Sequence, residues 1–140
     1  MAQRTRLHIL LLILVFITPG KALAQYDKQQ FFYMGQKLFF EGRYQQAIDN
    51  FNQLIQLDPE LHEAYFFRGI GKYNLGDFLG ARTDFDKALA IHPIFTLAYH
   101  YRAITHSRLG DYEKALADLQ EAIDLRPGYN GLYFSRGVTY

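Results

Sequence analysis

The chain has 140 residues and a formal net charge of +1, and 49% of its residues are hydrophobic, including 12 Phe and 11 Tyr. This length suits about one domain, and the apolar content is enough to build a core, which excludes general disorder. The absence of cysteine excludes disulfides, cysteine-ligated zinc, iron–sulfur clusters and a thiol nucleophile.

The first 24 residues have the organisation of a secretory signal peptide. Arg4 and Arg6 precede an apolar run at 7–17, and residues 22–24 read Ala-Leu-Ala, an A-x-A cleavage site. A run of about eleven apolar residues is too short to span a hydrocarbon core of about 30 Å. The alternatives are an uncleaved membrane anchor and a buried N-terminal helix. We expect cleavage after Ala24 and an exported protein.

Cleavage also changes the charge of the chain. It removes three of the 15 basic residues and none of the 14 acidic ones, which leaves a net charge of −2. A mildly acidic domain without a basic stripe is a poor candidate for nucleic-acid binding. We expect no nucleic-acid partner, and no stable membrane insertion of the mature chain.

A step of 34 residues organises the rest of the sequence. Seven columns of similar residues keep this step, too many for coincidence. The columns are Pro59, Pro93 and Pro127; Gly42, Gly76 and Gly110; Tyr44, Phe78 and Tyr112; Ala47, Ala81 and Ala115; Phe51, Phe85 and Leu119; Phe31, Tyr65, Tyr99 and Tyr133; and Gly35, Gly69, Ala103 and Gly137.

Each unit is expected to be two helices joined by a tight turn. An aromatic residue and a small residue four positions later share one face of the first helix, and the small residue lets the second helix approach. The glycine that follows ends the first helix. Asp77 and Asp111 then stand where they can cap a second helix. Proline ends each pair and opens the next first helix.

The pattern resembles the tetratricopeptide repeat, a 34-residue helix–turn–helix that stacks on its neighbours. The resemblance covers residues 28–140 and is clearest in residues 65–93, YFFRGIGKYNLGDFLGARTDFDKALAIHP. It implies an all-α, right-handed α-solenoid with repeats at 28–61, 62–95 and 96–129 and the first helix of a fourth repeat at 130–140. A signal peptide joined to this repeat resembles bacterial envelope proteins, which implies the periplasm or the cell surface.

Three departures from the repeat stand out. Arg82 occupies a column of Ile48 and Leu116, so the second repeat is expected to pack less well there. Ala103 replaces a glycine. An array needs a polar terminal cap, but the last segment carries Tyr133, Phe134, Val138 and Tyr140. We therefore expect either a longer repeat protein, which we favour, or a last helix that packs on something else.

No converging set of side chains predicts catalysis. His100 and His106 lie about 120° apart around a helix, so they are not a metal pair. Carboxylates of the second helices are expected in solvent, and phosphate loops, nucleophile elbows and zinc signatures are absent. We expect no enzymatic activity, no metal and no cofactor. The carboxylates in question are Asp84, Asp86, Asp118 and Glu121.

Two polar columns also keep the 34-residue step. Our hypothesis is a structural ladder in which an arginine of each first helix pairs with an acidic group of an adjacent second helix. The alternative is a row of arginines that binds anions. The columns are Arg68, Arg102 and Arg136, and Asn50, Asp84 and Asp118.

The family resemblance implies a concave groove lined by the second, fifth, ninth, twelfth and thirteenth residues of each repeat. Some of these side chains are expected to pack between neighbouring first helices, because the first helices are apolar on two faces. The rest would form an aromatic, weakly charged groove suited to an apolar peptide or an amphipathic helix. The candidate binding residues are Phe32, Gln36, Phe39, Phe40, Phe66, Ile70, Tyr73, Asn74, His100, Ile104 and Arg108, with Gln29, Glu63, Leu97, Ser107, Phe95 and Phe134 on the same side.

Family members that hold the acidic C-termini of chaperones use Lys, Asn and Arg in this groove. The matching positions here are Phe32, Gln36, Leu97 and Tyr101, so chaperone-tail binding is not expected. The function indicated is a non-enzymatic scaffold that binds a protein segment. The first alternative is a structural spacer or oligomerisation arm of a longer envelope protein whose function lies beyond residue 140. The others are an appended catalytic domain, and recognition of a glycan or lipid.

Overall fold

The computed structural model describes the backbone of residues 19–139, so residues 1–18 of the expected signal peptide lie outside the described part. Between residues 19 and 139 there are helices and no strand, which confirms the all-α prediction. The helices are α2 (Pro19–Phe40), α3 (Tyr44–Leu57), α4 (His62–Asn74), α5 (Phe78–Ile91), α6 (Thr96–Leu109), α7 (Tyr112–Leu125) and α8 (Asn130–Thr139).

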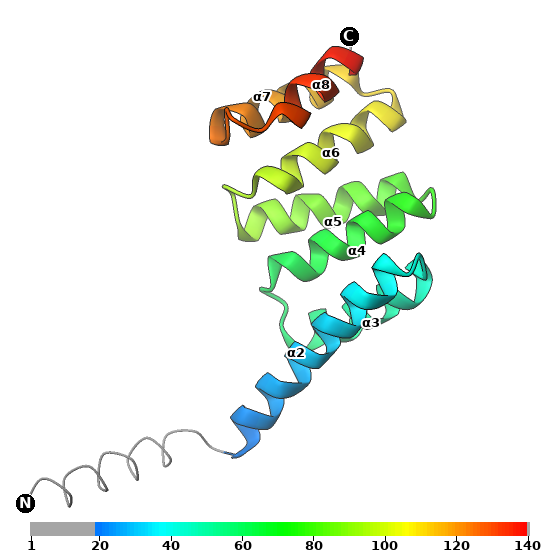
Figure 1. The fold of residues 1–140 in the computed structure, drawn as a ribbon, viewed down its shortest axis with the longest axis vertical. Helices are drawn as coiled ribbons and strands as arrows, with labels where there is room; N and C mark the ends of the chain where they lie inside the picture. Colours follow the sequence, from blue (N-terminus) through cyan, green and yellow to red (C-terminus); the bar gives the residue numbers. More distant parts are fainter. Residues whose placement is uncertain (1–18, 140) are drawn as a thin grey trace, which may run out of the picture.

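The helices pack in pairs that stack along one axis (Figure 1). α2 pairs with α3, α4 with α5, and α6 with α7, while α8 packs on α7. Each second helix also contacts the first helix of the next pair, and successive first helices contact one another. Within residues 19–139 the second helices do not contact one another. The first helices therefore form the inner layer of a curved stack, and the second helices form the outer layer.

The turn inside each pair depends on a glycine. Gly42, Gly76 and Gly110 end the first helices with φ angles of 75°, 84° and 84°. A β-carbon in this left-handed conformation costs about 1–2 kcal/mol, so glycine is favoured at each of these positions. The predicted turn is confirmed at all three.

The two predicted aspartate caps differ in the structure. The carboxylate of Asp77 accepts a hydrogen bond from the backbone N–H of Gly80 at 2.9 Å, as expected of a cap. Asp111 makes no such bond to α7, and that prediction is wrong. Its carboxylate instead lies 3.4 Å from Nζ of Lys114 and 3.5 Å from Nδ1 of His106.

The first helix is longer than the repeat pattern predicts. α2 begins at Pro19, whereas the first repeat was expected to start at residue 28. Proline is favoured at the first position of a helix, and residues 21–30 are mostly good helix formers, so nothing in this stretch interrupts the helix. The expected cleavage site after Ala24 lies within α2.

The core repeats one contact in each pair. Phe51 and Phe85 of the second helices are completely buried, and a β-carbon placed on Gly35 or Gly69 would lie 2.8 Å from their rings. In the third pair the same positions carry Ala103 and Leu119, which share one buried cluster. A ring therefore requires glycine opposite it, whereas the smaller leucine leaves room for alanine.

The side chain at Arg82 is less buried than its counterpart in the first repeat. Ile48 is buried against α4, where a β-carbon on Gly71 would lie 3.1 Å from its Cγ1 atom. Arg82 is only half-buried at the matching place on α5. The weaker packing expected there stays a prediction.

Candidate functional site

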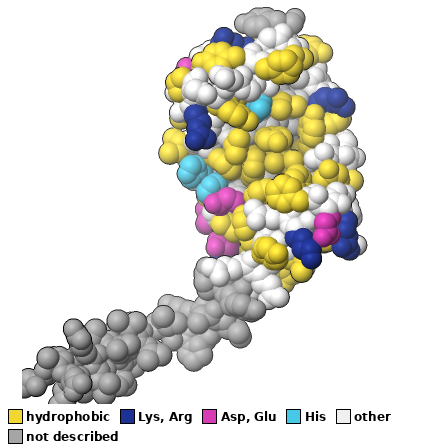
Figure 2. Space-filling model, viewed as in Figure 1, with side chains coloured by type: hydrophobic (Ala, Val, Ile, Leu, Met, Phe, Trp, Pro, Cys, Tyr) yellow, Lys and Arg dark blue, Asp and Glu magenta, His cyan; other side chains and the backbone are white. Residues whose placement is uncertain are grey.

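The inner layer presents an apolar surface. Figure 2 shows a face on which hydrophobic side chains form a broad band, with charged side chains toward its margins. α2, α4 and α6 carry the eleven candidate binding residues of the groove, while Phe95 precedes α6 and Phe134 lies on α8. The structure divides these residues into a buried set and an accessible set.

The buried set includes Phe66, Ile70 and His100, whose exposed fractions are 4%, 6% and 9%. The ring of Phe66 lies 4.8 Å from that of Phe95 and 5.6 Å from that of Tyr101, between centroids. Phe95 immediately precedes α6, and Tyr101 lies within α6. Phe66 and Ile70 therefore pack between repeats and do not line an open groove, because their helix face meets both α5 and α6.

The first accessible region, named here the N-terminal pocket, has a volume of about 280 Å³. Predicted residues Phe32 and Gln36 line it, together with Tyr33, which the groove positions did not include. Phe32 is held in place by edge-to-face contacts with Phe51 at 6.3 Å and Phe67 at 5.8 Å. The remaining lining residues are Lys28, Gln29, Asp58, Leu61 and Glu63.

Charged groups surround the N-terminal pocket unevenly. The Nζ atom of Lys28 lies 2.9 Å from a carboxylate oxygen of Asp58, so this cation is already paired. Glu63 adds a second carboxylate, whose oxygen lies 3.1 Å from Nδ1 of His62. The charge balance at this pocket favours a neutral or basic group over an acidic one.

The second accessible region, named here the C-terminal pocket, has a volume of about 270 Å³. It brings together predicted residues from two repeats, Tyr73 of α4 and Ile104 and Arg108 of α6. Phe78 holds two of them, since its ring lies 5.3 Å from that of Tyr73 and 5.1 Å from the guanidinium of Arg108. The remaining lining residues are Ser107, Leu119, Phe134, Ser135, Val138 and Thr139.

Besides the buried Phe66, Ile70 and His100, three of the candidate binding residues line neither pocket. Phe39 is half-buried, and its ring centroid lies 6.0 Å from that of Phe67. Phe40 is 77% exposed at the end of α2. The side-chain amide of Asn74 donates to the carbonyl of Ile70 at 2.8 Å, near the end of α4. These residues form the rim near the turns and not the floor of the groove.

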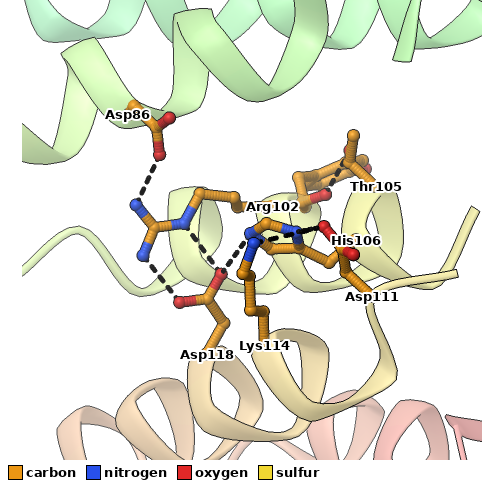
Figure 3. Close-up of polar contacts among 8 residues, drawn as sticks. Asp86, Arg102, Thr105, His106, Asp111, Lys114 and Asp118 are labelled. Atoms are coloured by element: carbon orange, nitrogen blue, oxygen red, sulfur yellow. Dashed lines mark hydrogen bonds and ion pairs between the residues drawn. The ribbon is translucent and has the colours of Figure 1, made fainter. Parts of the chain in front are cut away.

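The predicted arginine ladder is present in two repeats, and Figure 3 shows the pair formed by Arg102. Nε and Nη2 of Arg102 donate to both carboxylate oxygens of Asp118 at 2.8 and 2.6 Å. Arg68 holds Asp84 in the same way at 2.9 and 2.5 Å. The hydrogen bonds to Asp118, the largest cause, raise the pKa of Arg102 above its ordinary value. The guanidinium donors are thus used inside the protein, which supports the ladder over an anion-binding row.

The ladder corrects two expectations. Asp84 and Asp118 are buried, with exposed fractions of 2% and 6%, and do not stand in solvent, because the arginines compensate their charge. Asn50 does not join the ladder, since its side-chain amide donates to the carbonyl of Gln46 at 3.2 Å.

A second ladder column was missed by the sequence analysis. Each arginine also donates to a residue 16 positions before it. Because these acceptors keep the same offset in every repeat, the column could have been found in the sequence. These contacts join Nη1 of Arg68 to Asn52 at 2.8 Å, of Arg102 to Asp86 at 2.7 Å and of Arg136 to Gln120 at 3.3 Å.

Several histidines lie in the packing between repeats. Nε2 of His100 and Oγ of Ser135 are 2.8 Å apart, and the rings of His62 and His92 stack with centroids 4.4 Å apart. Burial lowers the pKa of His100. Burial is also the main cause that lowers the pKa of His62, opposed by Glu63 and reinforced by His92.

These shifts predict a loss of stability in mild acid. The unfolded chain binds protons at His62 and His100 as the pH falls through 6.5, whereas the folded chain binds them only at lower pH. The free energy of unfolding should therefore fall between pH 7.5 and 5.5. The variant His100→Phe should show a shallower fall, because it removes one of the two histidines. Phenylalanine is chosen because Phe66 occupies the matching position one repeat earlier. Chemical denaturation at several pH values measures this, and an unchanged slope would contradict it.

Neither a metal-binding cluster nor a membrane-spanning helix is found among the described residues. Within residues 19–139, no three His, Asp or Glu side chains come close enough together to hold a metal ion. Among the helices of the same range, none is long and apolar enough to cross a membrane.

Comparison with known proteins identifies the repeat. Tetratricopeptide repeat models match residues 34–93 and 96–129, together about two thirds of the chain. The second match spans the range expected for the third repeat. No curated protein sequence matches the chain significantly.

Similar solved structures belong to the same class. The Arabidopsis OM64 TPR domain has a TM-score of 0.80 and 21% identity, over 83% of this chain and 96% of that one. The first TPR of Spaghetti (RPAP3), bound to the HSP90 peptide SRMEEVD, has a TM-score of 0.76 and 25% identity, over 83% and 89%. MamA has a TM-score of 0.78 and 22% identity over 81% of this chain, which spans 66% of the MamA chain. The 34-residue step, the stacked helix pairs and the two family matches together show that the chain belongs to the tetratricopeptide repeat family.

Proposed function

We propose that this chain is a non-enzymatic scaffold that holds a segment of a partner protein along its concave face. Tetratricopeptide repeats are generally non-catalytic interaction modules, and similar structures contain bound peptides, among them Spaghetti (RPAP3) with an HSP90 peptide and yeast Sti1 with Hsp70. The observation that carries the proposal is the pair of similar pockets, of about 280 and 270 Å³, formed by groove positions of different repeats.

The chemistry of the two pockets indicates the kind of segment. Each pocket has an aromatic or aliphatic floor, with Phe32 in one and Ile104 in the other, which suits apolar anchor side chains. Asp58 and Glu63 place two carboxylates at the N-terminal pocket, whereas Arg108 is the charged residue that lines the C-terminal pocket. The proposed ligand is an apolar segment with a basic group at one end and an acidic group at the other.

This charge distribution argues against strongly acidic tails as ligands. A peptide such as SRMEEVD, bound by Spaghetti (RPAP3), would place carboxylates near Asp58 and Glu63 of this chain. Like charges at close range lower affinity. The absence of the Lys, Asn and Arg clamp noted in the sequence points the same way.

The groove is tested with peptides selected from a display library on the wild-type protein. Tyr33→Ser alters an exposed side chain of the N-terminal pocket, and Ile104→Ser alters the C-terminal pocket. Each change removes apolar contact area, so affinity measured by fluorescence anisotropy should fall by about tenfold or more, roughly 1.4 kcal/mol. Thermal melts of the variants must show that the fold survives.

The matched control is Tyr112→Ser, which changes an exposed tyrosine of the outer helix α7. This variant should bind the selected peptides as the wild type does. Equal weakening by the control, or a library that yields no peptide, would contradict the groove proposal.

We also propose that the protein is exported. The support is the N-terminal pattern of Arg4, Arg6, the apolar run at 7–17 and the Ala-Leu-Ala site at 22–24. The mass of the protein isolated from its native cell tests this, because a mature protein should lack residues 1–24. A mass that retains them would contradict export by cleavage.

A spacer or oligomerisation arm is the second candidate, and the exposed apolar surface of α8 favours it. Phe134 and Val138 are 75% and 71% exposed. Sedimentation equilibrium tests this candidate, because an oligomerisation arm must associate as the protein concentration rises. A chain that stays monomeric at high concentration would exclude self-association through this surface.

A further inference from the structure

The charges that line the N-terminal pocket do not balance. The lining includes one cation, Lys28, and two carboxylates, Asp58 and Glu63. Lys28 and Asp58 pair at 2.9 Å, so these two charges cancel. The Oε2 atom of Glu63 lies 3.1 Å from Nδ1 of His62, but burial lowers the pKa of His62, so this ring is neutral near pH 7. Among the residues that line the pocket, one negative charge is therefore uncompensated, and it lies on Glu63.

The carboxylate of Glu63 is both reachable from the pocket and partly removed from water. Its side chain is 39% exposed and lines the pocket, so a ligand can contact it. Its Oε2 atom is buried and accepts no hydrogen bond from the described residues. Partial burial of a charge without a compensating donor is unfavourable. A ligand that brings both N–H donors and a positive charge would compensate this carboxylate.

The repeat pattern does not require an acidic residue at this position. Glu63 matches Leu97 and Gly131 in the two following repeats. Asp58 likewise matches His92 and Arg126. The two carboxylates are thus particular to the first groove position of the chain, where they meet in one pocket.

Aromatic rings and amides complete the lining of the pocket. Tyr33 is 68% exposed, so most of its side chain is open to a ligand. Phe32 is held beside it by the edge-to-face contacts described above. Gln29 and Gln36 add side-chain amides. Because the face of an aromatic ring attracts cations, the pocket combines rings, amides and a free carboxylate that all suit a cationic group.

The chain itself shows which side chain satisfies this combination. The guanidinium of Arg68 lies 5.4 Å from the ring centroid of Tyr65. It also donates two hydrogen bonds to Asp84 and one, at 2.8 Å, to the side-chain amide oxygen of Asn52. A planar guanidinium with five donors can stack on a ring and bond several acceptors at once, whereas an ammonium group is a compact charge with three donors. A ring, a carboxylate and an amide are thus already joined by arginine in this fold.

We infer that the N-terminal pocket binds an arginine side chain of the partner segment, with Glu63 as the carboxylate that pairs with its guanidinium. This inference rests on the proposed function and deepens it, because it names the residue that the pocket selects. It also sets the direction of the segment. The arginine lies at the N-terminal pocket, and the acidic end lies toward Arg108 of the C-terminal pocket.

The first probes are peptides selected by display on the whole chain, each remade with citrulline in place of an arginine. Citrulline keeps nearly the shape of arginine but has no charge. The selected peptides should contain an arginine whose replacement weakens binding by about tenfold in fluorescence anisotropy, because the ion pair and the cation–ring contact are both lost.

A variant of the pocket locates this preference. Glu63→Gln should weaken binding of the arginine peptide by about three- to fivefold and leave binding of its citrulline form unchanged. The matched control is Glu60→Gln, which makes the same change of charge at an exposed residue before α4 and should preserve the preference. Glu63 also lies in the first turn of α4, where the helix dipole favours a carboxylate. A purely structural role would weaken both peptide forms equally and lower the melting temperature.

A second probe tests the pocket without any peptide segment. N-acetyl-arginine-N-methylamide, titrated into the whole chain, should shift the backbone amide signals of Tyr33, Gln36 and Glu63 in NMR spectra. The citrulline analogue should shift them much less, and Glu63→Gln should remove the difference between the two compounds.

The outcomes separate this inference from the proposed function. Selected peptides that lack arginine, that bind equally well with citrulline, or whose preference survives Glu63→Gln would overturn the inference and leave the scaffold in place. If no peptide is selected but the arginine derivative gives shifts that depend on Glu63, the arginine site stands and the scaffold proposal falls. The absence of both peptides and shifts would overturn both.

Discussion

Replacing Arg102 by methionine is expected to lower the free energy of unfolding by about 3 kcal/mol. Removing one member of a buried ion pair leaves the other charge buried without compensation. The carboxylate of Asp118, 6% exposed, would lose two hydrogen bonds from the guanidinium. The Nε2 atom of His106 lies 3.9 Å from this carboxylate. Urea denaturation measures the change.

Arg108→Met on the same helix provides a matched control. Arg108 is exposed and contacts the ring of Phe78, so its loss should cost less than about 1 kcal/mol. Arg102→Met with Asp118→Leu should recover much of the lost stability, because an apolar pair can replace a buried ion pair. An Arg102→Met variant as stable as the wild type would show that the ladder is not structural.

Replacing Gly69 by alanine is expected to lower the free energy of unfolding by about 1–2 kcal/mol. The new β-carbon would lie 2.8 Å from the ring of Phe85, and overpacking of this kind costs about 1–3 kcal/mol. The better helix propensity of alanine offsets up to about 1 kcal/mol of this. In a Phe85→Leu background the same change should be neutral or stabilising, because Ala103 and Leu119 already form that pair in the third repeat.

A double-mutant cycle isolates the effect. The coupling energy between Gly69→Ala and Phe85→Leu should be about 2 kcal/mol, in the range expected for residues in contact. Gly137→Ala serves as the control, because its β-carbon meets nothing within 4 Å and only the propensity gain should remain. Additive effects at Gly69 and Phe85 would contradict the account of the glycine column.

The architecture was predictable because each repeated column performs the same local task in every repeat. Gly42, Gly76 and Gly110 adopt the positive φ that their spacing predicts, and the ring-against-glycine contact follows from Gly69 and Phe85 sharing one helix pair. The start of α2 at Pro19 was not predictable from the repeat, because the helix continues beyond the columns into residues with no counterpart in other repeats.

The groove was harder to predict because one column can lie in different environments. Phe66 and Phe134 stand two steps of 34 apart, yet they are 4% and 75% exposed, since burial depends on the helices that follow and not on the residue itself. Asp118 illustrates the same limit. The sequence predicts that a carboxylate on a second helix is exposed to solvent, and only the structure shows that Arg102 pairs with it. Sequence alone therefore placed the candidate residues on the first helices but did not separate the accessible ones from the buried ones.

The central claim is that the concave face holds a partner polypeptide, and site-specific photo-crosslinking in the native cell tests it most directly. A photoreactive phenylalanine analogue at Tyr33 places the probe in the N-terminal pocket, and the same analogue at Tyr112 places it on the outer layer. The account predicts a discrete crosslinked polypeptide from position 33 and none from position 112. No product from position 33, or the same product from both positions, would contradict it.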